Sequence, residues 1–129
     1  MTLQLIPNGD LVFKGPFNVV STTKLQLANS GNERFAYKIK TTAPKRYCVK
    51  PNSGFLAPHT TVDIQVMLQP QNPGQQDDRA KHKFMVQWAA VPDAYSADVE
   101  NFVRSNDWFD GNWQVNFIDI LVERRFNQI

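Results

Sequence analysis

The sequence predicts an all-β fold, an immunoglobulin-like antiparallel β-sandwich of about seven strands with one short helical turn. Several short segments alternate apolar with polar residues, which is the pattern of strands with one buried face. Eight prolines and six glycines separate these segments, as turn residues do in β-proteins. The length of 129 residues fits one domain, which we expect to span residues 1–129. A small barrel is the alternative arrangement of the same strands.

The first half of the chain contains the first expected strands, at residues 3–6, 11–13, 22–27 and 35–40. Pro7-Asn8-Gly9-Asp10 is a strong turn signal after the first of them. The segment Asn29-Ser30-Gly31-Asn32 predicts a hairpin-like turn that leads into the strand at 35–40. These four short strands favour a sheet protein over a helical bundle.

The second half continues the same pattern with one change of period. The clearest alternation lies in residues 61–68, and a further strand is expected at residues 83–88. Residues 96–105 have apolar residues at helical spacing, which predicts a short helix or a turn of helix. The last expected strand is 113–122, where Phe117-Ile118 interrupts the alternation and predicts a bulge.

Residues 37–54 combine an amphipathic strand with basic turns. Pro44 should end this strand near Ala43, because proline brings no N–H to a ladder. Five cations lie on or beside the ribbon: Lys38, Lys40, Lys45, Arg46 and Lys50. A rigid basic surface with hydroxyl groups suits an anionic, extended partner. A solvated outer face is the alternative, since exposed lysines need no special explanation.

Composition excludes several classes of protein. The formal charge is only +2, with 14 basic against 12 acidic residues, so we expect no nucleic-acid partner. The single cysteine, Cys48, excludes an internal disulfide and fits a reducing compartment. No apolar run approaches the roughly 20 residues needed to span a bilayer. We therefore expect a cytoplasmic protein.

Enzyme signatures are missing from the sequence. It contains no Gly-x-Ser-x-Gly elbow, no phosphate-binding glycine loop and no His-Glu-x-x-His. His59 and His82 with one cysteine make a poor metal site, and Cys48 in its apolar run suits a buried, inert thiol. Asp77-Asp78 lies in a polar segment that should face solvent. We expect neither catalysis nor a cofactor or metal.

The outer face of the strand at 83–88 is the better candidate for a site. Alternation sends Phe84 and Trp88 into the core and leaves Met85 outward, beside Lys83. If this strand lies next to the strand at 35–40, a groove forms with a thioether floor and a cationic rim. Such a groove would hold an extended peptide with an aromatic anchor and acidic flanks. An exposed methionine without a role is the alternative.

Four stretches of the sequence resemble a known family. They are Lys38-Ile39-Lys40-Thr41-Thr42-Ala43-Pro44-Lys45-Arg46-Tyr47-Cys48-Val49-Lys50-Pro51-Asn52-Ser53-Gly54, Val66-Met67-Leu68-Gln69-Pro70, Lys81-His82-Lys83-Phe84-Met85-Val86-Gln87 and Phe13-Lys14-Gly15-Pro16-Phe17. They are similar to the major-sperm-protein (MSP) domains of VAMP-associated proteins (VAPs). The resemblance implies an immunoglobulin-like sandwich that binds FFAT motifs, which are phenylalanines in an acidic tract. It implies an adaptor or tether at membrane contact sites, on the cytosolic face of the endoplasmic reticulum if the parent protein carries a C-terminal anchor.

The resemblance also implies roles for individual residues. The aromatic pocket would consist of Lys83 and Met85, helped by Phe84. The residues that bind the peptide backbone and its acidic side chains would be Lys38, Lys40, Thr41 and Thr42. Lys45 and Lys50 would attract the acidic flank, while Pro44 and Pro51 would have structural roles in the loops beside the site.

The C-terminal third departs from the VAP pattern. Typical VAPs carry lysine and arginine in the last strand, where this chain reads Asn112-Trp113-Gln114-Val115-Asn116. Val86-Gln87-Trp88 and Asp107-Trp108-Phe109-Asp110-Gly111 look more like nematode major sperm protein, whose relatives form filaments. A self-assembling cytoskeletal protein is therefore the alternative function. A third hypothesis is that the basic face binds phosphoinositide headgroups.

Overall fold

The computed structural model describes residues 3–71, 82–96, 98–105 and 113–123. These residues form nine strands and one helix, and two of the strands were not expected as separate elements. The strands are β1 (Leu3–Ile6), β2 (Leu11–Lys14), β3 (Ser21–Asn29), β4 (Arg34–Thr41), β5 (Tyr47–Lys50), β6 (Ser53–Leu56), β7 (Thr60–Leu68), β8 (Lys83–Val91) and β9 (Gln114–Glu123), and the helix is α1 (Val99–Ser105).

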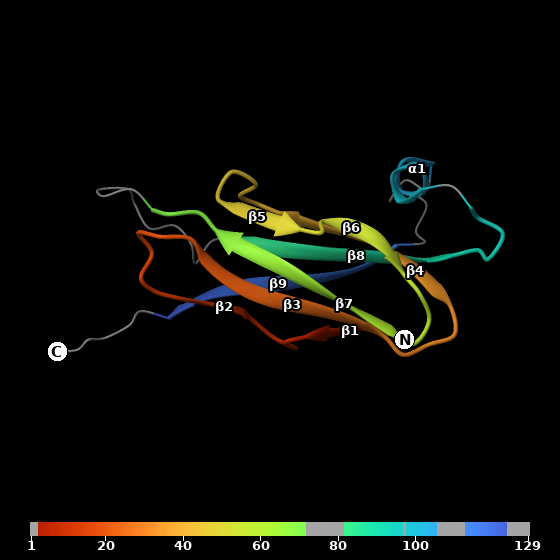
Figure 1. The fold of residues 1–129 in the computed structure, drawn as a ribbon, viewed down its shortest axis with the longest axis horizontal. Coiled ribbons are helices and arrows are strands. Elements are labelled where there is room, and N and C mark those ends of the chain that lie inside the picture. The colour runs from red at the N-terminus through yellow and green to blue at the C-terminus, as the bar shows by residue number, and fades with distance from the viewer. Residues whose placement is uncertain (1–2, 72–81, 97, 106–112, 124–129) are drawn as a thin grey trace.

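The strands form two sheets that pack face to face as a sandwich (Figure 1). One sheet has the order β1-β3-β7-β5 and the other the order β2-β9-β8-β4-β6. The expected β-sandwich is confirmed, with nine strands among the described residues rather than seven. Pairing is antiparallel except between β2 and β9, which run parallel.

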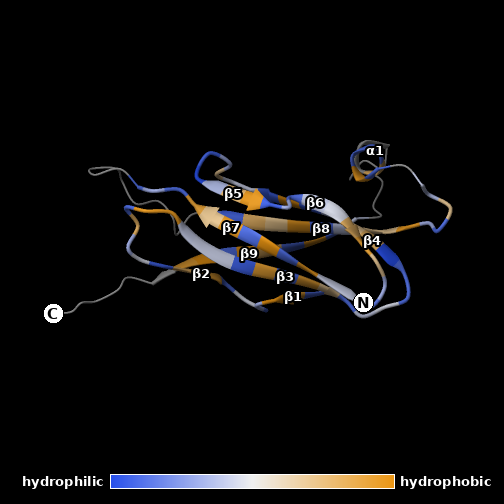
Figure 2. Ribbon diagram, viewed as in Figure 1, coloured by the Kyte–Doolittle hydropathy of each residue, from blue (hydrophilic) through white to orange (hydrophobic). Residues whose placement is uncertain are grey.

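The core lies between the two sheets, and strict alternation builds it. Hydrophobic and hydrophilic residues follow one another along β3 and β7 (Figure 2). Leu25, Leu27, Ile64 and Val66 are fully buried, and the residues between them are more exposed. Burying such aliphatic side chains contributes about 1.5–3 kcal/mol each, so this alternation fixes which face of each strand points inward.

The turn after β3 does not close a hairpin, so that prediction was wrong. β3 pairs with β1 and β7, whereas β4 belongs to the other sheet. The buried side chain of Asn29 holds the crossover, because its Nδ2 donates to the carbonyl oxygens of Glu33, Leu56 and Ala57. Its Oδ1 also accepts a hydrogen bond from the backbone N–H of Gly31. One amide group thus fixes two separate segments of backbone at the point where the chain changes sheets.

The last strand has no bulge at Phe117-Ile118, which corrects a second prediction. β8 pairs with β9 in unbroken register from Lys83↔Asp119 to Trp88↔Gln114. The alternation looked interrupted because β9 carries apolar residues on its solvent face as well as on its core face. Phe117 is 67% exposed, whereas Ile118 is buried.

The expected helix is confirmed as α1, which lies at one end of the sandwich beyond β6 (Figure 1). Phe102 of this helix is buried, and its ring lies 5.1 Å from that of Tyr95 and 6.1 Å from that of Trp113, centroid to centroid. These aromatic rings pack on Ala36 and Ala89 of the five-stranded sheet. The helix therefore covers one end of the outer face of that sheet.

Candidate functional site

β4 and β8 are neighbours, so the condition for the predicted groove is met. They pair antiparallel, with Lys40 opposite Met85 and Lys38 opposite Gln87. Phe35, Tyr37 and Ile39 point into the core, as do Phe84 and Trp88. The intervening residues of both strands therefore share the outer face of the five-stranded sheet.

β9 completes this surface on the other side of β8. Met85 lies opposite Phe117, Gln87 opposite Val115 and Lys83 opposite Asp119. We call the uncovered part of this outer face the open face, made of Lys38, Lys40, Thr42, Lys83, Met85, Val115, Phe117 and Asp119. Gln87 is buried on the same side and lies between the open face and the part that α1 covers.

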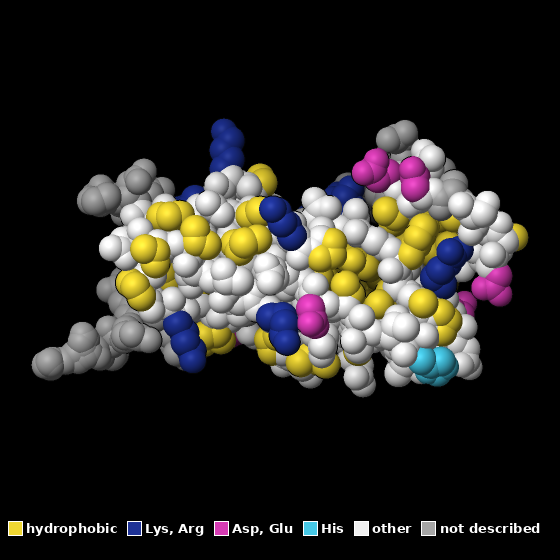
Figure 3. Space-filling view, viewed as in Figure 1, with side chains coloured by type: hydrophobic (Ala, Val, Ile, Leu, Met, Phe, Trp, Pro, Cys, Tyr) yellow, Lys and Arg dark blue, Asp and Glu magenta, His cyan; other side chains and the backbone are white. Residues whose placement is uncertain are grey.

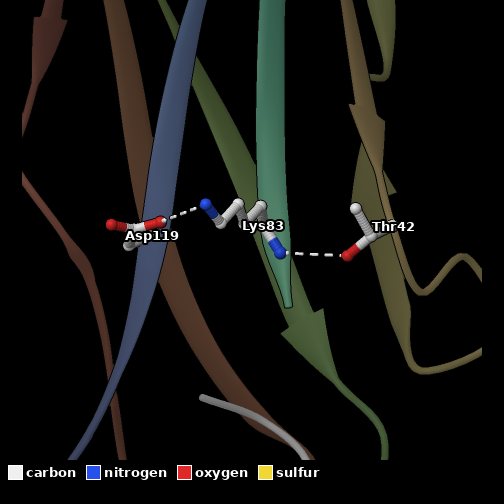
Figure 4. Close-up of polar contacts among 3 residues, drawn as sticks. All are labelled: Thr42, Lys83 and Asp119. Carbon is white, nitrogen blue, oxygen red and sulfur yellow. Dashed lines mark hydrogen bonds and ion pairs between the residues drawn. The ribbon is translucent and has the colours of Figure 1, made fainter. Parts of the chain in front are cut away.

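Lys83, the first residue of β8, contacts the end of β4 and the middle of β9 (Figure 4). Its backbone N–H donates to Thr42 Oγ1 at 3.0 Å, and its carbonyl oxygen accepts from the N–H of Thr42 at 3.1 Å. Its Nζ lies 3.9 Å from Asp119 Oδ1. Both side chains are more than half exposed, so this ion pair is worth at most about 1 kcal/mol. The ammonium group is positioned by Asp119 and remains accessible to a ligand.

Met85, Val115 and Phe117 form an apolar surface within the open face, which we call the apolar floor. Met85 is half-buried between Lys40 and Phe117, while Val115 and Phe117 are 44% and 67% exposed. A thioether beside an exposed aromatic ring is a favourable contact surface for another aromatic side chain. The apolar floor therefore offers an unfilled hydrophobic contact beside lysine side chains.

Two of the predicted peptide contacts lie on the other side of the sheet. Phe84 is fully buried, and its ring packs edge-to-face on Tyr47 with centroids 4.9 Å apart. It supports β8 from the core and reaches no ligand on the open face, which corrects its expected part in the aromatic pocket. Thr41 pairs with Phe84 and so has the same orientation as that core residue. Its Oγ1 accepts a hydrogen bond from the N–H of Ala43 at the end of the strand.

Lys45 and Lys50 belong to the segment that crosses to the other sheet. Lys45 lies in the turn before β5, and Lys50 ends β5, which pairs with β7 in the four-stranded sheet. Both residues are exposed at that edge, away from the rows of β4, β8 and β9. Neither residue belongs to the strands β4, β8 and β9 that form the open face.

The loops around Pro44 and Pro51 are held by backbone hydrogen bonds. The N–H of Arg46 donates to the carbonyl oxygen of Ala43 across the turn that contains Pro44. The N–H of Ile39 donates to the carbonyl oxygen of Asn52, the residue after Pro51. Gly54 packs on Tyr37, and a Cβ there would lie 2.7 Å from the phenol oxygen. Burial raises the pKa of the Tyr37 phenol, so the ring packs as a neutral group.

The histidines have structural partners. His82 is buried, with Nδ1 2.9 Å from the Tyr47 hydroxyl oxygen, and His59 Nε2 lies 2.9 Å from Asn32 Oδ1. Cys48 is half-buried rather than fully buried. Among the described residues no three His, Cys, Asp or Glu side chains gather that could hold a metal ion. Asp77-Asp78 lies outside the described residues.

Sequence reasoning missed three residues of the open face: Val115, Phe117 and Asp119. The signal for them was present as the interrupted alternation of the last strand, which we interpreted as a bulge. An apolar residue on the solvent face produces the same interruption as an inserted residue. Only the register with β8 distinguishes the two.

In the part of the chain that the structure describes, no helix combines the length and hydrophobicity that a membrane span requires. Two curated relatives are each similar over 70% of the chain. The vesicle-associated membrane protein/synaptobrevin-binding protein of Aplysia californica is 54% identical over 91 residues, which are 70% of this chain and 35% of that protein. Human vesicle-associated membrane protein-associated protein A is 51% identical over 90 residues, which are 70% of this chain and 36% of that protein. The chain thus matches about a third of the length of these relatives.

Solved structures of low sequence identity share the fold. SSP-19, an MSP-domain-like protein of Caenorhabditis elegans, matches with a TM-score of 0.64 at 20% identity, over 91% of this chain and 97% of that one. WR4, a C. elegans MSP family member, matches with a TM-score of 0.63 at 16% identity, over 92% and 97% of the two chains. Residues 2–110 match the family described as the MSP (Major sperm protein) domain. The chain therefore belongs to the MSP domain family, and its curated relatives are VAMP-associated proteins.

Proposed function

We propose that the open face is a non-catalytic peptide-binding site for FFAT-type motifs, in which phenylalanine lies within an acidic tract. The observation that carries this proposal is the row formed by Lys40, Met85 and Phe117 on three adjacent strands. The row places a cation, a thioether and an exposed aromatic ring side by side. An acidic peptide with an aromatic side chain has groups complementary to each of them.

The apolar floor supplies most of the affinity in this arrangement. A phenylalanine that packs on Met85 and Phe117 removes apolar surface from water, and full burial of such a side chain is worth about 1.5–3 kcal/mol. Lys38 and Lys40 on β4 attract the acidic residues, which chiefly raises the association rate and sets the register of the ligand. Lys45 and Lys50 at the sandwich edge extend this attraction beyond the open face.

The relatives support an interaction module rather than an enzyme. The Aplysia relative is named as a synaptobrevin-binding protein, so a protein partner is recorded in its name. We propose that this domain likewise binds protein partners, as an adaptor or tether on the cytosolic face of the endoplasmic reticulum. That location requires a membrane anchor in the parent protein.

Fluorescence anisotropy with a labelled acidic peptide containing two phenylalanines tests the proposal. Replacing Lys83 and Met85 by aspartate should abolish binding, because it puts negative charge at the centre of the apolar floor. A matched control makes the same change of net charge on the opposite sheet, as Thr22→Asp with Lys24→Asp, at two exposed positions of β3 that are likewise two residues apart. Full affinity in the Lys83/Met85 variant, with its circular dichroism unchanged, would rule the site out.

The opposite sheet suits this control because its surface carries mixed charge. Figure 3 views the molecule from the side of β3 and β7, where Lys and Arg side chains stand apart from one another and one of them adjoins an acidic side chain. Lys24 is paired across the ladder with Gln65, in the sheet that contains no residue of the open face. Loss of binding in this control would show that net charge, rather than the open face, determines affinity.

Self-assembly is the second candidate function. The observation that favours it is the exposure of Val115, Phe117 and Leu121 along β9, since exposed apolar surface is typical of association sites. Light scattering over a concentration series separates the two functions, because a filament-forming protein grows with concentration and a peptide-binding monomer does not. Binding to phosphoinositide headgroups stays a prediction that liposome sedimentation can test.

A further inference from the structure

We infer that Val115 and Phe117 form a second subsite that selects a hydrophobic residue of the ligand two positions from its aromatic anchor. This inference rests on the proposed function and names the specificity of the same site. It concerns β9, which supplies the exposed apolar side chains of the open face. The argument has three steps: the chemistry of β9, the distribution of charge across the open face, and the repeat of an extended ligand.

The first step is that the β9 side of the open face is apolar. Val115 and Phe117 point outward two residues apart, and both are substantially exposed. Neither packs in the aromatic cluster beneath α1 or in the main core. A phenylalanine that is 67% exposed leaves much of its ring in water, so a ligand side chain on it would gain hydrophobic free energy.

The second step is that the net charge differs across the open face. Lys38 and Lys40 lie on β4 at one side, whereas Asp119 lies on β9 at the other, one row beyond Phe117. Asp119 is ion-paired with Lys83 at 3.9 Å, so this part of the open face is close to neutral and offers an acidic ligand residue no net attraction. Charge complementarity therefore places the acidic residues of the ligand over β4 and leaves its hydrophobic residues for β9.

The third step is geometric. Side chains on one side of an extended peptide repeat every two residues, about 6.6–6.8 Å apart. Val115 and Phe117 have the same spacing, because they occupy alternate positions of one strand. A ligand that runs along the strands and rests its aromatic anchor on Met85 and Phe117 brings its residue two positions away over the row that contains Val115. That ligand residue contacts the apolar side chain of Val115. A lysine or arginine at residue 115 would instead favour an acidic ligand residue.

Peptide pairs that differ at one residue test the subsite. Each labelled acidic peptide carries one phenylalanine, with either leucine or glutamate two positions before it or two positions after it. For one of the two positions, the wild-type domain should bind the leucine peptide about five- to tenfold more tightly than the glutamate peptide, as expected for partial burial of a leucine side chain. The variant Val115→Lys should reverse that preference while still binding an acidic peptide, because Met85 and Phe117 remain in place under the aromatic anchor.

Leu121→Lys is the matched control. Leu121 is an exposed apolar residue of the same strand and has the same orientation, but Asp119 separates it from Phe117. This variant should keep the leucine preference of the wild type. Equal binding of leucine and glutamate peptides at both positions, unchanged by Val115→Lys, would overturn the inference and leave the proposed function intact. Failure of every peptide to bind the wild type would overturn the proposed function and this inference with it.

Sedimentation velocity provides the remaining outcome. If the wild type is a dimer at micromolar concentration and Val115→Lys/Phe117→Lys is a monomer, the two side chains serve contact with a second copy of the chain, and the subsite is refuted. A wild-type monomer under the same conditions supports the subsite, since the exposed side chains then remain available to a peptide.

Discussion

The outer face of the five-stranded sheet has two regions made by the same strands. Under α1 the face carries Ala36 opposite Ala89, and both side chains are buried by the helix. Two rows further along, the same face carries Lys40 opposite Met85. The described part of the chain leaves these two side chains only half-buried. Small residues let a helix approach the sheet, whereas long side chains keep the neighbouring rows open.

The comparison shows how one sheet face supports both stability and recognition. In the covered region the rings of Phe55, Tyr95 and Phe102 contact one another edge to face, with Trp113 against Phe102. In the open region the one large aromatic side chain among the described residues, Phe117, has no ring partner that the structure records within the face. Ring-to-ring contacts therefore stabilise the covered region, whereas the ring of Phe117 in the open region remains largely exposed.

The largest expected difference between the regions is in stability. Phe102→Ala should lower the free energy of unfolding by about 3 kcal/mol, because it leaves a cavity in a buried aromatic cluster. Phe117→Ala should change it by less than about 0.5 kcal/mol, because that ring is mostly in water already. Urea denaturation of both variants gives the comparison. Equal losses would mean that Phe117 packs in solution and that the open region is not open.

The second contrast concerns added volume. Ala89→Leu should destabilise the domain by about 1–3 kcal/mol, since the larger side chain has to displace the aromatic cluster beneath α1. Met85→Leu keeps the volume and should cost less than about 1.5 kcal/mol, although it removes the flexible thioether. Thermal denaturation measures both changes. Tolerance of leucine at residue 89 would indicate that α1 is only loosely attached to the sheet.

The covered region shows what sequence patterns can predict and where they stop. Period-two alternation predicted the inward faces of β3, β4, β7 and β8, because each of these strands has one clearly apolar face. The helix was predicted from its spacing, but its place on Ala36 and Ala89 was not. The contact of Phe102 with Ala36 joins residues 66 positions apart in the sequence (102 minus 36), which no local pattern records.

The open region shows the complementary failure. β9 is apolar on both faces, so alternation alone allows two assignments of inward and outward residues, and a bulge was invoked to reconcile them. Pairing with β8 decides the matter and puts Phe117 beside Met85. Similarly, the residues 29–32 have the composition of a hairpin turn, while the buried partners of Asn29 at Leu56 and Ala57 make it a crossover. In both cases a tertiary contact settles what local composition leaves ambiguous.

The smallest expected effect compares one cation from each region. Arg34 Nη2 donates to the carbonyl oxygens of Tyr95 at 2.7 Å and Pro92 at 3.1 Å, and its guanidinium carbon lies 4.8 Å from the centre of the Phe55 ring. Arg34→Met should therefore destabilise the domain by about 1 kcal/mol, by leaving these carbonyl groups with fewer donors. Peptide binding should be unaffected, because the side chain holds the segment before α1 and lies outside the open face.

Lys38→Met is the matched change on the open face. It should leave the stability of the domain nearly unchanged and slow the association of the peptide. The free energy of unfolding should stay within about 0.5 kcal/mol of wild type, since the aliphatic part of the side chain is preserved. The association rate of an acidic peptide should fall at low salt and approach the wild-type value as salt rises, because exposed charges are screened beyond about 10 Å at 0.1 M. Stopped-flow fluorescence at two ionic strengths measures this. If Lys38→Met slowed association equally at both, the lysine would act through short-range contact rather than through long-range steering.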